Sequence, residues 1–76
     1  MSDGYEELAS AIILQAVKDW RSAVRKLKKR PRYDPAKQMK EECEQFFLSE
    51  WFEQLTSVDG RYLLRKLKQE EGINDG

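Results

Sequence analysis

The first 30 residues carry one uninterrupted helical pattern, which limits the possible folds more than any other feature of the chain. Apolar residues recur every three or four positions over about seven turns, so they share one side of a helix. They are Tyr5, Leu8, Ala9, Ile12, Ile13, Ala16, Val17, Trp20, Ala23, Val24 and Leu27. Asp3 with Glu6 resembles a capping box, and Pro31 ends the helix because it lacks an N–H. We predict a helix over about residues 4–30 whose apolar stripe must be covered by other elements.

The segment after Pro31 predicts a second helix and then a break. Asp34 before Pro35 provides a capping carboxylate and a proline at the first helical position, so we expect a helix over residues 35–48. If the helix continued to residue 55, its apolar residues would form two sets about 100° apart around the axis. The first set is Ala36, Met39, Cys43, Phe46 and Phe47, and the second is Leu48, Trp51, Phe52 and Leu55. We therefore expect a break at Ser49 and a short helix over residues 50–55; an unbroken helix would expose some of these aromatic residues.

The remaining residues predict a last helix and its stop signal. Thr56 with Asp59 repeats the capping pattern, so we expect this helix over residues 57–71. Gly72 can adopt the left-handed conformation of a Schellman stop, after which Ile73 can fold back on Leu67. No strand pattern is present. The sequence thus predicts a single domain, residues 1–76, of the all-α class: a compact bundle of three to four helices with a long first helix.

The composition argues against a disulfide, a zinc site and acid–base catalysis. The single cysteine, Cys43, cannot form an internal disulfide, and the absence of histidine removes both the usual zinc ligands and the commonest acid–base group. We therefore expect no cofactor, no metal and no enzyme. No apolar run is long enough to cross a membrane and the opening residues are acidic, which favours a cytoplasmic protein. A core this small also leaves a homodimer open.

The charges balance overall but are unevenly distributed. Ten Lys or Arg against two acids lie in residues 17–40, whereas six acids and no base lie in residues 41–60. Helical projection gathers the cations on the side of the first helix opposite its apolar stripe, with two further residues expected at the end of this basic ridge. The ridge residues are Lys18, Arg21, Arg25, Lys28 and Lys29, followed by Arg32 and Tyr33.

Three interpretations of the basic ridge remain open. It could be a solvated helix face whose last cations favour the helix C-terminus, a surface for phosphates, or a surface for an acidic protein. Leu14, Trp51 and Phe52 are the candidates for a protein interface, although aromatic residues in so short a chain more often lie in the core. The acids are expected on a solvated or salt-bridging face, and Cys43 in the core. The acids in question are Glu41, Glu42, Glu44, Glu50 and Glu53.

Two segments, "AIILQAVKDW" and "FFLSEWFEQLTSVDGRYLLRKL", resemble short helical proteins encoded by phages and prophages of Gram-positive bacteria. The resemblance implies a bacterial host cytoplasm and an accessory role, and it implies no site residues. With the basic ridge, it favours a non-enzymatic accessory binding module that contacts nucleic-acid phosphates without reading sequence. The alternative is a protein–protein adaptor or inhibitor, which could be a dimer, that uses an aromatic surface.

Overall fold

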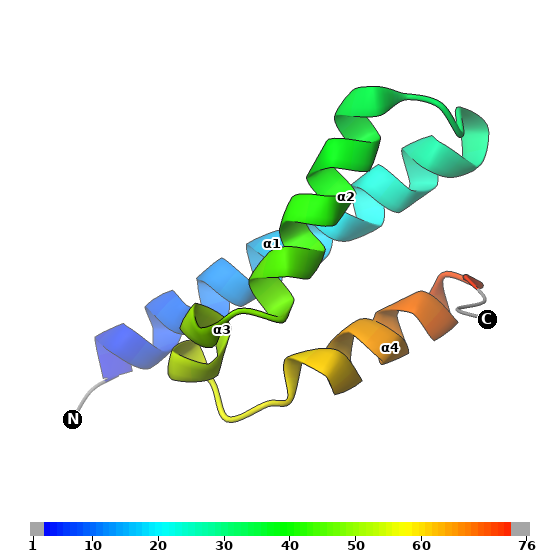
Figure 1. Cartoon of the computed structure of the whole chain (residues 1–76). Helices are drawn as coiled ribbons and strands as arrows, with labels where there is room; N and C mark the ends of the chain where they lie inside the picture. The colour runs from blue at the N-terminus through cyan, green and yellow to red at the C-terminus, as the bar shows by residue number, and fades with distance from the viewer. Residues whose placement is uncertain (1–2, 74–76) are drawn as a thin grey trace.

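The computed structural model describes residues 3–73, and the side chains of residues 7–73. The described chain forms four helices and no strand: α1 (Asp3–Lys29), α2 (Asp34–Phe47), α3 (Glu50–Leu55) and α4 (Gly60–Glu70). α1 and α2 lie antiparallel to each other, α3 contacts both of them, and α4 packs against α2 (Figure 1). The all-α bundle with a long first helix is therefore confirmed. The capping box expected from Asp3 and Glu6 involves side chains outside the described residues.

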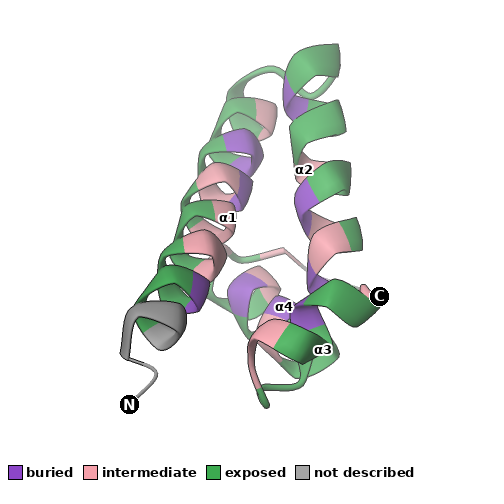
Figure 2. Cartoon of the chain, turned by 90° about the vertical axis from the view of Figure 1, so that its left-hand side faces the viewer, coloured by how far each residue is buried: buried purple, intermediate pink, exposed green. Residues whose placement is uncertain are grey.

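The core lies where all four helices meet (Figure 2). It is a cluster of Trp20 and Val24 from α1, Cys43 and Phe47 from α2, Phe52 from α3, and Leu64 and Leu67 from α4. The Phe47 and Phe52 rings pack edge to face, with centroids 5.8 Å apart, a geometry that adds to the gain from burial. Trp20 has no exposed surface, which confirms its predicted place in the core.

The break between α2 and α3 falls at Ser49, as the sequence predicts. The Ser49 hydroxyl donates to the Phe46 carbonyl at 2.7 Å and accepts from the Phe52 N–H at 3.2 Å. It therefore satisfies one backbone group of the helix that ends and one of the helix that begins. The break turns the chain so that Phe52 faces the core while its neighbour Trp51 is 56% exposed.

Two helix starts differ from the prediction. Asp34 does not cap α2; it is already the first helical residue, and the carbonyl of Tyr33 accepts from the N–H groups of Ala36 and Lys37, both at 3.1 Å. The carboxylate of Asp34 still lies in the first turn, where negative charge is favourable. The capping role assigned to Asp34 is therefore wrong, although the helix begins within one residue of the predicted place.

α4 begins three residues later than expected. Thr56 ends α3, and its hydroxyl accepts from the Val58 N–H at 3.2 Å, while Asp59 is the capping residue and accepts from the Arg61 N–H at 2.9 Å. The reason is a close contact at Gly60, where a Cβ atom would collide with the Phe47 carbonyl. The chain bends at Ser57 and Val58, and the helix begins where Gly60 lies against the end of α2.

The C-terminal stop of α4 is the predicted Schellman motif. Gly72 has φ of 75°, its N–H donates to the Gln69 carbonyl at 3.1 Å, and the Ile73 N–H donates to the Lys68 carbonyl at 2.8 Å. Ile73 folds back against the core cluster. Within residues 3–73, no helix combines the length and the apolar composition needed to cross a bilayer.

Trp20→Ala should lower the free energy of unfolding by about 3–5 kcal/mol, because it removes the largest side chain from a close-packed core. Denaturant unfolding followed by circular dichroism measures this loss. Trp51→Ala is the matched control, since it deletes the same side chain from an exposed position and should cost about 1 kcal/mol or less. Equal losses in the two variants would contradict the placement of the core.

Candidate functional site

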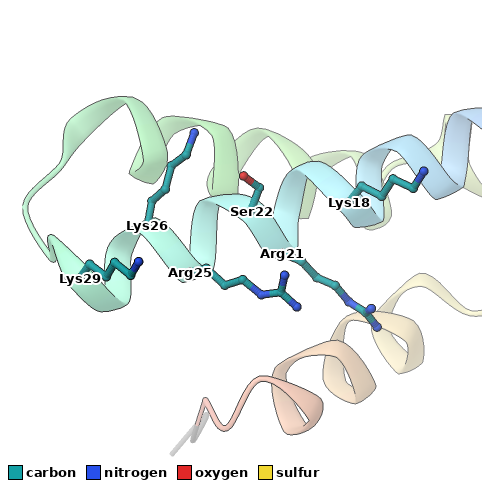
Figure 3. A pocket seen from close by; sticks show the side chains of 6 residues that line it. All are labelled: Lys18, Arg21, Ser22, Arg25, Lys26 and Lys29. Atoms are coloured by element: carbon teal, nitrogen blue, oxygen red, sulfur yellow. The ribbon is translucent and has the colours of Figure 1, made fainter.

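The solvent-facing side of α1 carries a shallow basic hollow of about 430 Å³ (Figure 3). Residues spaced three and four apart along one helix share a face, and this spacing brings the cations together over three turns. The lining residues are Lys18, Arg21, Ser22, Arg25, Lys26 and Lys29. We call these six residues the basic face. Five cations and one hydroxyl can all donate hydrogen bonds to an anion.

One flank of the basic face is paired with the end of α4. In Figure 3 the side chains of Arg21 and Arg25 point toward α4. The Arg21 Nη2 lies 2.6 Å from the Glu70 Oε1, and the Arg25 Nη2 lies 3.7 Å from the Glu71 Oε2. Lys28, just outside the basic face, lies 3.6 Å from the Glu71 Oε1 and also donates to the Glu71 carbonyl. The Glu71 carbonyl and the carboxylates of Glu70 and Glu71 thus provide negative charge from within the chain, which we call the internal anion.

The Arg21–Glu70 pair is too exposed to contribute much to stability. Both partners of the Arg21–Glu70 pair are solvated, so this pair is worth about 0–1 kcal/mol. The Arg25 side chain is 67% exposed, whereas its partner Glu71 is only 10% exposed. The Nε of Arg21 is covered and has no hydrogen-bond partner among the described residues, which costs free energy. The Arg21 and Arg25 side chains keep solvent-exposed surface, so another anion can reach them.

The other flank of the basic face has no internal partner. Lys18, Lys26 and Lys29 are exposed, and within the described part of the chain none of them forms an ion pair or hydrogen bond through its side chain. Lys26 points away from α4 in Figure 3, on the side opposite to Arg21 and Arg25. Three lysines are thus available to an external anion without breaking any contact.

The structure brings together only part of the predicted ridge. Lys18, Arg21, Arg25 and Lys29 lie in the basic face, and Lys28 turns to Glu71. Arg32 is exposed in the turn after α1. Tyr33 lies between α1 and the start of α2, where it lines a hollow with Ser22 and Lys26 at the edge of the basic face, and the Arg30 guanidinium lies 5.9 Å from its ring centre.

Two residues of the basic face were missed. Ser22 and Lys26 lie one turn apart on α1, and both project toward the edge of the ridge rather than its centre. The sequence does contain the signal, because Lys26 belongs to the same "KLKK" run as Lys28 and Lys29. Treating the ridge as a wider face would have included it.

The three residues predicted for a protein interface do not form one surface. Phe52 has no exposed surface, so its assignment to an interface is wrong; α3 directs it into the core. Leu14 is 59% exposed, but it projects from the basic side of α1, about 160° around the helix from Ile12. Trp51, on α3, lies beside Ile12 instead. Of the three predicted interface residues, Trp51 and Leu14 are exposed, and they face different directions.

The acidic and thiol groups show structural roles. Among the described residues no three His, Cys, Asp or Glu side chains are grouped to hold a metal ion. Cys43 is buried, as predicted. Burial, and then the negative charges of Asp19, Glu42 and Glu44, raise the pKa of its thiol to about 11. The thiol therefore stays protonated at neutral pH and is a poor nucleophile.

Glu44 is the acid most closely built into the fold. It accepts from the Trp20 Nε1 at 3.0 Å, and its carboxylate lies 2.8 Å from the Lys40 Nζ. Burial by itself would raise the pKa of Glu44, but the hydrogen bonds from Lys40 and Trp20 and the charges of Lys40 and Lys68 outweigh it and lower the pKa below 4.5. Glu44 is therefore charged at neutral pH and satisfies the one polar atom of the Trp20 ring.

Comparison with models of protein families, with curated proteins and with solved structures finds no match to this chain. The resemblance to phage and prophage proteins therefore stays a prediction.

Stability should fall as the pH drops below 4.5, the ordinary pKa of a glutamate. In this window the unfolded state binds a proton at Glu44 and the folded state does not, so the free energy of unfolding decreases as the pH falls through the lowered pKa of Glu44. Denaturant unfolding between neutral and acidic pH measures the slope. Glu44→Gln keeps an acceptor for Trp20 and should show a shallower slope; identical slopes would contradict the role of Glu44.

Proposed function

We propose that this protein is a non-enzymatic binding module whose basic face contacts nucleic-acid phosphates without reading the base sequence. The observation that carries the proposal is the gathering of five cations on one exposed helix face, with three lysines left without an internal partner among the described residues. Such a surface releases counterions from a polyanion, which is the main source of sequence-independent affinity.

The composition of the basic face suits phosphate contacts and lacks the side chains that recognise adenine or stack on unpaired bases. It contains no asparagine, no glutamine and no aromatic ring, the side chains that read adenine edges or stack on unpaired bases. Its lysines, arginines and serine are typical donors to phosphate oxygens. The face spans residues 18–29, about 16 Å along the helix axis, which is long enough for several successive phosphates.

The biological setting is part of the same proposal. The resemblance of two segments to phage and prophage proteins favours an accessory role in the cytoplasm of a bacterial host. An acidic protein could occupy the same face, since carboxylates and phosphates attract the same cations. Nucleic acid is preferred because a polyanion can engage the exposed lysines together along the whole face, whereas a protein presents carboxylates more sparsely.

Binding to labelled duplex DNA should be independent of sequence and strongly dependent on salt. Three to five phosphate contacts predict a slope of log affinity against log salt of about −3 to −4.5, which is a loss of roughly 20-fold to 140-fold between about 50 and 150 mM salt. Fluorescence anisotropy measures both values. No binding at the lower salt concentration would remove the proposal.

A pair of matched charge reversals locates the contact. Lys18→Glu with Lys29→Glu should weaken binding to all sequences alike, because both lysines lie in the basic face. Lys37→Glu with Lys66→Glu makes the same change in net charge on α2 and α4 and should weaken binding far less. Equal losses would mean that net charge, and not the basic face, determines the affinity.

Removing the internal anion should strengthen binding. Glu70→Gln with Glu71→Gln frees Arg21 and Arg25, while Lys28 keeps its bond to the Glu71 backbone carbonyl. Affinity should therefore rise, and the salt slope should steepen by about 0.9 for each cation that gains a phosphate. Glu41→Gln with Glu50→Gln is the control, because it changes the net charge equally at exposed acids elsewhere. The same anisotropy titration applies. An unchanged slope in the first variant would show that the α4 carboxylates do not compete with phosphates.

A further inference from the structure

A second hollow, of about 410 Å³, lies between α1, α2 and α3 and is apolar. Its walls are Ile12 and Ala16 of α1, Met39 and Phe46 of α2, and Trp51 of α3. Trp51 is 56% exposed and Met39 is 40% exposed, whereas the core aromatics Trp20 and Phe52 have no exposed surface. The Trp51 ring packs edge-on against Phe46, with centroids 5.4 Å apart, so it is held in place at the surface. A fixed, exposed tryptophan is a typical anchor for a protein partner.

This hollow continues along α1 and α2 as a groove. An adjoining hollow of about 230 Å³ shares Asp19 and Met39 with the first and extends to Tyr33 and Lys26. Along α1 the two hollows cover residues 12–26, which is about 21 Å, or four turns of helix. We call the two hollows together the apolar groove. A groove of this length between two helices fits the apolar stripe of a third helix.

The charged residues of the apolar groove indicate which charges a bound helix would carry. The charged residues that line the hollow beside Trp51 are Asp19 and Glu42, and the adjoining hollow adds Lys26 at its far end. Asp19 accepts from the Gln15 Nε2 at 3.0 Å and Glu42 accepts from the Gln38 Nε2 at 3.2 Å, and neither forms an ion pair with any described residue. Both carboxylates can therefore pair with cations of an occupant, and both would repel a phosphate backbone.

A second copy of the chain fits the apolar groove poorly. A two-fold symmetric contact would bring the Asp19 and Glu42 carboxylates of both copies to one apolar surface, where like charges repel. Insertion of another copy's basic face would instead be a head-to-tail contact, which leaves the groove of the inserting copy unfilled. The charge pattern therefore favours a different polypeptide.

We propose that the apolar groove binds an amphipathic helix of another protein, one that carries Lys or Arg beside its apolar stripe. The proposal does not depend on nucleic-acid binding at the Trp51 end of the groove, because the residues of the hollow beside Trp51 and those of the basic face project from different sides of α1. The two surfaces share Ser22 and Lys26 at the Tyr33 end. The apolar stripe of the partner covers Trp51 and Met39, and its cations pair with Asp19 and Glu42.

Two designed helical peptides of about 16 residues test the proposal. They share one leucine stripe and lack tryptophan; lysines flank the stripe in one, and glutamates in the other. The lysine peptide should bind about tenfold more tightly at low salt, as expected for two partly desolvated ion pairs, and should shift the emission of Trp51 to shorter wavelength. Trp20 is buried in both states and contributes a constant background.

Variants of the protein identify the site. Asp19→Lys with Glu42→Lys should reverse the preference to the glutamate peptide, and Trp51→Ser should abolish binding measured by calorimetry. Leu14→Ser is the control, because Leu14 is equally exposed on another side of α1 and its loss should change nothing. Equal affinity for both peptides, no binding, or no reversal would overturn the proposal. Self-association in sedimentation that Trp51→Ser abolishes would also overturn it, because a second copy would then occupy the groove.

Discussion

The need to cover the apolar stripe of α1 determines the rest of the structure. α1 has 27 residues and α2 only 14, so α2 alone cannot cover the stripe. The chain therefore turns at Ser49 and again before Gly60, which brings Phe52, Leu64 and Leu67 to the same place as Trp20. Burial is concentrated where four helices meet, and the surface beside α3 stays partly open. The apolar groove is thus a consequence of how short the covering helices are.

Local sequence signals were sufficient where local interactions decide the structure. The extent of α1, the break at Ser49 and the stop at Gly72 each depend on residues within one or two turns, and all three follow the sequence pattern. The start of α4 does not, because Gly60 must first contact the Phe47 carbonyl, which is 13 residues away in the chain. Thr56 has good capping chemistry, but this tertiary contact overrides it.

In the candidate site, too, the local pattern predicted some features, and tertiary contacts decided the others. Helical period alone predicted that Lys18, Arg21, Arg25 and Lys29 share a face. It could not predict that α4 supplies carboxylates to Arg21 and Arg25, since those residues are separated by more than 40 positions. Nor could it separate Trp51 from Phe52: both are large aromatics in adjoining positions, and only the docking of α3 makes one exposed and the other buried.

The two proposed surfaces lie around one helix, and salt decides whether they influence each other. An α-helix with its side chains is about 10–12 Å across, and the screening length is about 8 Å at physiological salt but about 30 Å at 0.01 M. At physiological salt, Asp19 and Glu42 are therefore largely screened from the distant part of the basic face. At very low salt their field reaches across α1 and opposes the lysines. Because the net charge of the chain is zero, any attraction of the basic face for a polyanion has to arise within a screening length of its own cations.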